Sequence, residues 1–400
     1  MRILQITKKF PYPAKDGEVI AILNAIKGFK SLGHDIKTLS LNTVKHHFDV
    51  ATLPEHIKQL ADFEALEIDT SIKAADAFFN LFTDKSYNIE RFFSYEFEEA
   101  IAQNLSAEKF DVVFLEGIYL MRYIDVIRKN THAKVVLRLH NVEYIIWERL
   151  ARETTNPIKR FYLNLLVKRL KHFELSNINH ADSVIAVSKE DEDLFKNNGL
   201  TKPSVTIPIG YDLVRNENVD FSKEKSNSVC FIGSMDWMPN YEGIQWFLSD
   251  VWKLITAQIP NAQFFLAGRS FPETLLNWKQ KGVKVLGEID DAQAFILSNP
   301  VFVVPLFAGS GMRVKVIEAM ALGRAVVATY IGAESIHYTD GKNILIADDK
   351  VAFANAVVRI LNDSNLRNQI GHHAQELIRN EYENNLCCKR MIQFIEGETA

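Results

Sequence analysis

The chain has 400 residues, of which 47% are hydrophobic, so it is long enough for two domains that each bury a core of their own. Its formal net charge of −4 gives no electrostatic reason to expect a nucleic acid as a partner. Cys230, Cys387 and Cys388 match neither the spacing of a metal site nor a disulfide framework, which favours a reducing compartment. Because no apolar run approaches the ~18 residues of a membrane span, we expect a soluble cytoplasmic protein.

Short runs of Val, Ile and Leu alternate with amphipathic stretches along the first half of the chain. Among them are RILQIT at 2–7, DVVFLEG at 111–117 and KVVLRLH at 134–140. Continuous apolar strands that are separated by helices indicate a parallel sheet covered on both faces. Such a sheet binds ligands at the carboxyl ends of its strands, so functional residues should follow strands directly.

His140 occupies such a place, because it ends the strand expected over 134–139 and is followed by Asn141 and Glu143. A neutral imidazole at this edge can hydrogen-bond a ligand hydroxyl. The alternative is a histidine whose hydrogen bonds are satisfied within the core. We favour the functional role, and we do not assign His140 as a general base.

Residues 156–174 predict a helix with one apolar face and several cations around it. The apolar side chains are Ile158, Phe161, Tyr162, Leu165, Leu166, Leu170 and Phe173, and the cations are Lys159, Arg160, Lys168, Arg169 and Lys171. The simpler expectation is that this helix packs on its own domain with the lysines in water. Helices of this kind also lie on anionic membranes, so peripheral contact with the inner face of the membrane stays open.

The acidic run DED at 191–193 has the Asp-x-Asp form of a metal site, but Ser188 stands just before it at an expected helix start. Acidic side chains stabilise the first turn of a helix, and a serine can cap it. We therefore expect these carboxylates, and the pairs at 290–291 and 348–349, to serve as caps or turns.

The composition changes at residues 213–227, which are polar, charged and almost free of apolar pattern, as an interdomain linker is. Strand and helix patterns then resume with SVCFIG at 228–233. We predict an N-terminal domain over 1–212, a C-terminal domain over 228–380 and a C-terminal helix over 381–400 that packs back on the first domain. Both domains should be Rossmann-like α/β units that face each other across a cleft.

The segment GSGMRVKVIEAMALG at 309–323 combines a glycine-rich turn with an apolar helix, directly after an expected strand. Gly309 and Gly311 allow the backbone to approach a ligand closely. Unpaired N–H groups near Met312 and Arg313 would then point at that ligand, and such a helix start binds anions.

Charge inside this helix adds to the prediction of an anion site. Arg313 and Lys315 supply two cations, which suits a pair of phosphates and is unfavourable for the helix dipole. The alternative is an ordinary ion pair between Lys315 and Glu318, with Arg313 reaching into solvent. Because residues 314, 316, 317 and 319–322 are all apolar, the helix is covered on most sides and its charges need a partner.

Three stretches resemble the retaining nucleotide-sugar glycosyltransferases of the GT-B fold, in glycosyltransferase family four. They are HNVEYIIWERL at 140–150, FIGSMDWMPNYEGIQWF at 231–247 and LGEIDDAQAFILSNPVFVVPLFAGSGMRVKVIEAMALGRAVVAT at 286–329. The resemblance covers nearly the whole chain and is strongest over 229–347. It implies an enzyme that moves a sugar from a nucleoside-diphosphate sugar to an acceptor with retention of configuration.

The family's functional residues carry over to matching positions. The loop and helix matching 309–318 hold the donor diphosphate, the glutamate matching Glu318 binds the ribose, and the turn matching Gly287–Ile289 lines the base. The loop matching Asp16–Gly17 approaches the phosphates or the acceptor, and the histidine matching His140 contacts the transferred sugar. The resemblance implies catalytic roles for His140, Arg313, Lys315 and Glu318, and donor binding by Gly17, Gly233, Ser234, Glu288, Ile289, Gly309, Ser310, Gly311, Met312, Arg313, Lys315 and Glu318.

Two departures from the family pattern matter. Ser310 stands where the first of two glutamates is usual, so the acidic contact to the donor sugar is missing or moved. The usual arginine and lysine after the first strand of the second domain are absent, with Ser234 near the arginine position. A subset of such enzymes carries Gly-Ser-Gly-x-Arg-x-Lys instead, and we infer that Arg313 and Lys315 supply the phosphate charges, so that no metal is required.

Rival functions remain beside this one. A nucleotide-sugar epimerase shares the two-domain fold, and a non-catalytic nucleotide- or sugar-binding descendant would fit Ser310 and the missing cations. A nicotinamide oxidoreductase is disfavoured, because TKKFPYPAKDG at 7–17 lacks the Gly-x-Gly-x-x-Gly fingerprint. We expect a nucleotide sugar and a glycan, lipid-linked or small-molecule acceptor as partners, as in polysaccharide biosynthesis, and no metal or other cofactor.

Overall fold

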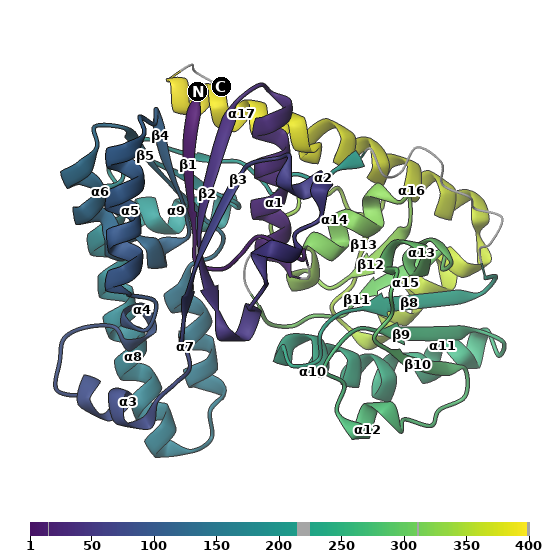
Figure 1. Ribbon diagram of the computed structural model, residues 1–400. Helices are drawn as coiled ribbons and strands as arrows, with labels where there is room; N and C mark the ends of the chain where they lie inside the picture. The colour runs from purple at the N-terminus through teal and green to yellow at the C-terminus, as the bar shows by residue number, and fades with distance from the viewer. Residues whose placement is uncertain (15, 214–224, 310–311, 398–400) are drawn as a thin grey trace. The chain divides into compact units, whose positions relative to one another are not determined.

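The structure is a computed structural model that describes residues 1–14, 16–213, 225–309 and 312–397. It divides into two compact units, each of which is described by itself (Figure 1). The first unit runs over Met1–Gly210, includes Met312 and resumes at Asn384, and the second takes in Tyr211–Gly309 and Arg313–Glu383. Most of the predicted linker, residues 214–224, lies outside the described residues, as do Ser310 and Gly311.

In the first unit, the described residues form a seven-stranded parallel sheet with the order β3-β2-β1-β4-β5-β6-β7. The strands are β1 (Arg2–Thr7), β2 (Asp35–Thr43), β3 (Asp62–Ile68), β4 (Val112–Glu116), β5 (Lys134–Leu139), β6 (Ser183–Ala186) and β7 (Ser204–Thr206). Consecutive side chains of a strand point to opposite faces, so Leu4 and Ile6 enter one buried cluster and Ile3 enters another. Burial on both faces explains why these strands are continuously apolar.

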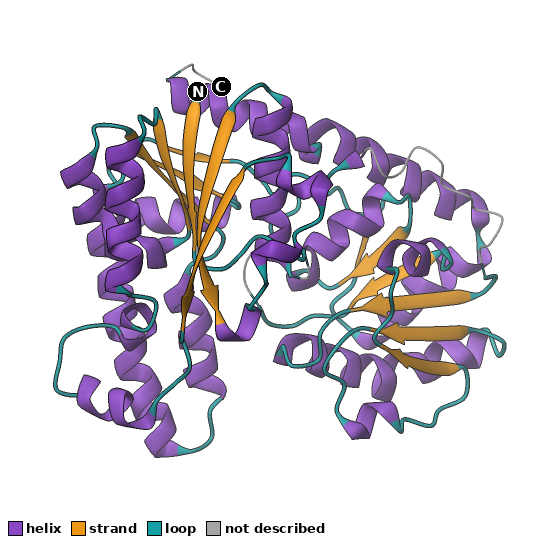
Figure 2. Cartoon of the chain, viewed as in Figure 1, coloured by secondary structure: helices purple, strands orange, loops and turns teal. Residues whose placement is uncertain are grey.

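Helices cover both faces of this sheet (Figure 2). One face packs against α5 and α6, and the other against α1 and α17. The helices are α1 (Gly17–Ser31), α2 (Glu55–Lys58), α3 (Ala74–Asn80), α4 (Tyr87–Glu90), α5 (Tyr95–Ala107), α6 (Ile124–Asn130), α7 (Glu143–Glu153), α8 (Pro157–Asn177), α9 (Lys189–Asn197) and α17 (Asn384–Glu396). Short 3₁₀ turns occupy Val44–His46, Val50–Thr52, Ile118–Tyr123 and Ile178–His180.

The C-terminal helix α17 is a core element of the first unit. Cys387 and Cys388 are buried free thiols in the same apolar cluster as Phe29 of α1. The two helices approach so closely that a Cβ added at Gly28 would lie 2.2 Å from the Cys388 sulfur. These cysteines therefore act as small apolar side chains, a common use of buried free cysteine.

The helix predicted over 156–174 forms as α8, and the Asn156 side chain caps it. Leu163, Leu166 and Leu170 are buried, so the helix packs on its own unit, as we expected. The predicted apolar face is wrong in the first turn, where Ile158 and Phe161 are 81% and 73% exposed. None of the helices in the described part of the chain is long and apolar enough to cross a membrane.

In the second unit, the described residues form a six-stranded parallel sheet with the order β10-β9-β8-β11-β12-β13. The strands are β8 (Ser228–Ile232), β9 (Gln263–Ala267), β10 (Val283–Gly287), β11 (Val301–Val304), β12 (Ala325–Ala328) and β13 (Leu345–Ile346). The helices are α10 (Met238–Trp246), α11 (Trp252–Gln258), α12 (Glu273–Leu276), α13 (Ala292–Leu297), α14 (Val314–Ala321), α15 (Lys350–Asn362) and α16 (Ser364–Leu377), with π turns at Phe247–Val251 and Ile378–Tyr382 and a 3₁₀ turn at Ile331–Ala333. The predicted class, two Rossmann-like α/β units, is confirmed.

One aspartate of each acidic pair caps a helix, and the run at 191–193 follows a serine cap, as predicted. Ser188 Oγ accepts a hydrogen bond from Asp191 N at 3.2 Å and caps α9. Asp291 and Asp349 cap α13 and α15 in the same way, and Asp348 accepts from the backbone of the turn after β12. Ordinary helix-start chemistry thus accounts for these runs.

Candidate active site

Glu116 and His140 meet at the carboxyl edge of the first sheet. Glu116 is the last residue of β4, which pairs with β5, and His140 follows β5 directly. His140 Nε2 lies 2.7 Å from Glu116 Oε2, and since a carboxylate only accepts, Nε2 carries the proton and donates it. His140 Nδ1 is buried and has no hydrogen-bond partner among the described residues. This nitrogen is therefore left to accept a hydrogen bond from a ligand hydroxyl.

Glu116 is wholly buried and fixed by neighbouring strands. Gln5 of β1 donates to its Oε1 at 2.6 Å, and Arg138 Nη1 lies 3.6 Å from the same oxygen. Burial raises the pKa of this carboxyl, but the charge of Arg138 and the hydrogen bond from His140 outweigh it and hold the pKa below its usual range. The ionised carboxylate orients the imidazole. Our sequence prediction missed Glu116, although a carboxylate that ends an apolar strand was a usable signal.

Asp16, in the loop between β1 and α1, is held by hydrogen bonds and by an ion pair. Asp16 caps α1 by accepting from Glu18 N at 3.1 Å and Val19 N at 3.0 Å. Its carboxylate also accepts from Lys9 Nζ at 2.9 and 3.0 Å. Gly17, a predicted site residue, is the first residue of α1 and lies at the same edge of the sheet as His140. The Asp16 carboxylate is thus engaged by protein groups, whereas Gly17 is exposed.

A second ion cluster links this loop to the start of α7. Lys8 Nζ lies 3.4 Å from Glu18 and 3.5 Å from Glu143, and Tyr119 donates to Glu143 at 3.0 Å. Burial raises the pKa of Glu18, but Lys8 and Lys9 outweigh it and bring the pKa to about 2. Glu18 therefore stays ionised across the physiological range and pairs with both Lys8 and Lys9.

In the second unit, Lys315 reaches the loop that follows β8. Its ammonium donates to Asn240 Oδ1 at 2.7 Å and lies 4.2 Å from the centroid of the Phe231 ring. Asn240 in turn donates to the backbone oxygen of Ser234 at 2.8 Å. Two predicted site residues, Ser234 and Lys315, are therefore joined through Asn240. The sequence prediction did not include Asn240, since nothing local marks it off from other polar residues in a first helical turn.

Arg313 occupies the N-cap position of α14. Its side chain is only 5% exposed, so the alternative in which it reaches into solvent is wrong. Its guanidinium lies 5.3 Å from the Trp237 ring centroid. Gly309 has φ +123°, and a Cβ there would approach Arg313 Nη2 to 2.6 Å and the Trp237 ring to 2.9 Å. The turn therefore requires glycine at this position.

The charges of Arg313 and Lys315 act on each other. Burial, and then the charge of Arg313, hold the pKa of the Lys315 ammonium well below its usual value. The fold thus keeps two cations close together, with a neutral amide as the hydrogen-bond acceptor of Lys315. Such a pair favours the binding of an anion with more than one charge.

The other predicted residues lie along the same edge of the second sheet. Gly233 follows β8, and its N–H donates to Ala267 O at 3.1 Å. Glu288 and Ile289 follow β10, whose last residue accepts a hydrogen bond from the loop after β9. Glu318 is half-buried on α14, and Met312 is buried. The predicted roles of Ser310 and Gly311 lie outside the described residues.

Comparison with known proteins places the chain in a family. The family model described as "Glycosyltransferase Family 4" matches residues 17–215, and the model described as "Glycosyl transferases group 1" matches residues 226–363. An uncharacterized 44.6 kDa protein of the cps region of Klebsiella pneumoniae is 22% identical over 96% of both chains. A phosphatidyl-myo-inositol mannosyltransferase of Mycolicibacterium smegmatis is 29% identical over 42% of this chain and 45% of its own.

A solved structure shows the same fold. Anabaena Alr3699/HepE, in complex with UDP, superposes with a TM-score of 0.69 at 13% identity and covers 99% of this chain and 100% of its own. Two parallel sheets, each covered by helices, are arranged in the chain as in the GT-B glycosyltransferases. The two family models together span most of the described chain. The protein is therefore a glycosyltransferase of family four, with the GT-B fold.

Proposed function

We propose that the protein transfers a sugar from a nucleoside-diphosphate sugar to an acceptor, with retention and without a metal ion. The observation that carries the proposal is a pair of neighbouring cations at the start of α14, the buried Arg313 and the half-buried Lys315. Two like charges held together destabilise the empty site, and a bound diphosphate relieves that repulsion. The Anabaena relative in the comparison was crystallised with UDP, which supports a nucleotide donor.

The cations would also act on the reaction. When the bond between the sugar C1 and the diphosphate oxygen breaks, negative charge grows on the diphosphate, and Arg313 and Lys315 stabilise it. The acceptor oxygen bonds C1 on the face that the diphosphate leaves, and its proton passes to a diphosphate oxygen. These two side chains supply the charge that a metal ion supplies in other transferases.

We assign roles in binding and positioning the substrates to the remaining site residues. His140 Nδ1 accepts a hydrogen bond from a hydroxyl of the transferred sugar, and Glu116 holds the imidazole in the required tautomer. Glu318 accepts from the ribose hydroxyls, while backbone groups of Glu288 and Ile289 line the base. Gly17 approaches the phosphates or the acceptor.

The acceptor and its location are part of the proposal. We infer a glycan or lipid-linked acceptor at the inner face of the membrane, with peripheral contact through α8. Its first turn keeps Ile158 and Phe161 exposed beside Lys159 and Arg160, so apolar and cationic side chains are both available there.

Incubation of the purified protein with a panel of nucleotide sugars tests the proposal. Release of free nucleoside diphosphate supports transfer, or hydrolysis when no acceptor is present. An isomerised nucleotide sugar would instead identify an epimerase, and binding without turnover would identify a non-catalytic descendant. A thermal-shift screen with UDP, GDP, ADP and CMP selects the base, because a ligand at 100 times its Kd adds ~2.7 kcal/mol to the stability of the folded state.

A further inference from the structure

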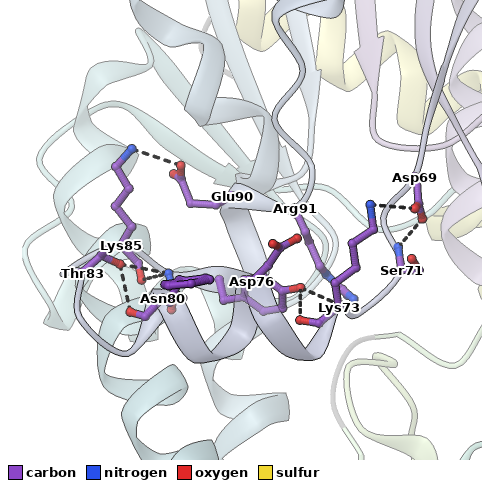
Figure 3. Close-up of a pocket in the computed structure, with 11 residues that line it drawn as sticks. Asp69, Ser71, Lys73, Asp76, Asn80, Thr83, Lys85, Glu90 and Arg91 are labelled. Carbon is purple, nitrogen blue, oxygen red and sulfur yellow. Dashed lines mark hydrogen bonds and ion pairs between the residues drawn. The ribbon is translucent and has the colours of Figure 1, made fainter.

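Two hollows lie side by side on the first unit, and they differ in charge. One, here called the Asp76 pocket, has a volume of about 370 Å³ and is shown in Figure 3. Its charged side chains balance, because Lys73 pairs with Asp69 at 3.1 Å and Lys85 pairs with Glu90 at 3.2 Å. Asp76 and Arg91 also line it, so three carboxylates face three cations and the Asp76 pocket has no net charge that would favour an ionic ligand.

The second, here called the Lys45 hollow, has a volume of about 460 Å³ and shares Ser71 and Arg91 with the Asp76 pocket. Four cations line it, namely Lys8, Lys9, Lys45 and Arg91, whereas Glu18 is the one carboxylate that lines it within the described residues. A volume of this size is in the range of small-molecule sites. Its charge asymmetry favours an anionic ligand.

Lys8 and Lys9 are already neutralised, so the available charge lies on the other two cations. Lys8 and Lys9 pair with Glu18 and with carboxylates behind the wall of the hollow. By contrast, neither Lys45 nor Arg91 forms an ion pair with any residue that the structure describes. Arg91 donates from Nη1 to Thr70 O at 3.3 Å, and its Nε is buried without a hydrogen-bond partner in the described chain. A buried N–H of a guanidinium costs free energy until a ligand oxygen accepts from it.

Hydroxyl and imidazole groups complete the lining. Thr43 Oγ1 is buried and has no hydrogen-bond partner among the described residues. His46 also lines the hollow, and burial together with the charge of Lys9 lowers the pKa of its imidazole. The walls of the Lys45 hollow therefore carry two cations, Lys45 and Arg91, that lack an ion-pair partner in the described part of the chain, and several neutral donors. This combination suits an oxyanion with several oxygens.

The hollow adjoins the His140 site. Lys8 lines the Lys45 hollow, and its ammonium lies 3.5 Å from Glu143, which follows His140 closely in the chain. Tyr119 lines it as well and donates to Glu143, just beyond His140 in the chain. A ligand held in the hollow is therefore next to the residues that we assign to the transferred sugar.

We propose that the Lys45 hollow binds a phosphoryl group of the acceptor, so that the substrate which receives the sugar is a phosphorylated molecule rather than a neutral glycan. The inference rests on the proposed transferase function. Lys45 and the Nε edge of Arg91 hold the phosphoryl oxygens, and Thr43 contributes a hydroxyl. The phosphoryl group anchors the acceptor and takes no part in bond making, so the acceptor's attacking hydroxyl is a different group of the same molecule.

Calorimetric titration with inorganic pyrophosphate tests the hollow directly. The full-length protein is first saturated with the nucleoside diphosphate that the thermal-shift screen selects, so that the site at Arg313 and Lys315 is occupied. Lys45→Gln and Arg91→Gln should each weaken pyrophosphate binding by about 10- to 100-fold, the worth of a charged hydrogen bond. Lys85→Gln is the matched control, because it removes the same charge from the neighbouring Asp76 pocket, and its affinity should equal that of the wild type.

Three results would each contradict either the phosphate site in the Lys45 hollow or the proposed transferase function. Equal pyrophosphate affinity in all four proteins would remove the hollow as a phosphate site. A parallel loss of nucleotide affinity in Lys45→Gln would assign the hollow to the donor's phosphates instead. If no nucleoside diphosphate binds the wild type, the proposed transferase function fails, while the pyrophosphate titration still decides the hollow. Lys45 is exposed, so its variant keeps the test valid even if Arg91→Gln folds poorly.

Two further arms identify the source of the phosphate. Glycerol 3-phosphate is titrated by calorimetry, and phosphatidylcholine vesicles that contain phosphatidic acid are tested by cosedimentation, with phosphatidylserine vesicles of matched charge beside them. Binding of either phosphate monoester that is lost in Lys45→Gln supports the inference and names a soluble or a lipid-linked acceptor. The inference would be contradicted if the protein binds neither glycerol 3-phosphate nor the phosphatidic acid vesicles. It would also be contradicted if the wild type and Lys45→Gln bind the phosphatidic acid and phosphatidylserine vesicles equally well.

Discussion

Replacement of Lys315 by methionine should stabilise the empty protein and weaken its binding of nucleoside diphosphate. The ammonium sits against the Phe231 ring and donates to Asn240, and burial and the charge of Arg313 depress its pKa. Methionine fills similar space without a charge. The substitution removes the desolvation cost of the ammonium and its repulsion with Arg313, and it loses one charge-assisted hydrogen bond to Asn240, worth about 1.5–3 kcal/mol. We expect the first two effects to outweigh the third.

The pH dependence of this effect has a definite sign. The pKa of Lys315 is lower in the folded than in the unfolded state, so between the two values the unfolded state binds more protons. The free energy of unfolding of the wild type therefore rises with pH in this window, by at most about 1.4 kcal/mol per pH unit, until it levels off above the ordinary value of 10.5. Lys315→Met should lack this contribution.

Urea denaturation from about pH 7 to about pH 9.5 measures the stability, and calorimetry measures the affinity for nucleoside diphosphate. Lys253→Met serves as the control, because Lys253 is an exposed lysine of the same unit. Loss of one charged contact to phosphate should weaken nucleotide binding by about 10- to 100-fold. A variant that is less stable at every pH and binds nucleotide normally would refute the reasoning, since Lys315 would then only anchor Asn240.

Four other outcomes are expected. Glu318→Gln should weaken nucleoside diphosphate binding by about tenfold with an unchanged melting temperature, and a lowered melting point with intact calorimetric affinity would contradict the ribose assignment. Glu116→Gln should lower turnover by about 10- to 100-fold while nucleotide affinity stays constant, and a wild-type rate would exclude Glu116 from orienting His140. Gly28→Ala should cost about 1–3 kcal/mol in urea denaturation through its clash with Cys388, whereas an unchanged midpoint would show that α1 and α17 can separate freely. Transfer should persist in EDTA, and a rate lost there and restored by manganese would overturn metal independence.

Local sequence signals were enough for the strands and the caps. The strand predicted over 134–139 matches β5 residue for residue, because its apolar run is bounded by Lys134 and His140. Ser188 caps the helix that was expected to follow it, and Asp291 belongs to a pair that was expected to form a cap or a turn and caps α13. In each case the interaction lies within a few residues of the chain, so propensity and pattern determine it.

Contacts between distant segments could not be predicted in the same way. Gln5 and Glu116 meet because β1 pairs with β4, although 111 residues separate them, and Lys315 meets Asn240 across 75 residues. A single sequence does not show which strands are neighbours, so the polar partners of a predicted site residue stay hidden. The prediction that the first turn of α8 is buried is wrong for a related reason. Ile158 and Phe161 extend past the surface that buries Leu163.

The membership of α17 in the first unit has a consequence for synthesis of the chain. During translation, the strands and α1 of that unit leave the ribosome long before Asn384–Glu396 exists. The apolar cluster that Ile3 and Phe114 of the nascent sheet form with Phe29 of α1 must therefore stay without its α17 side chains while the whole second unit is made. That interval is a window for chaperone binding or aggregation, and a nascent chain stalled before Asn384 should be more sensitive to protease in its first unit than the released protein.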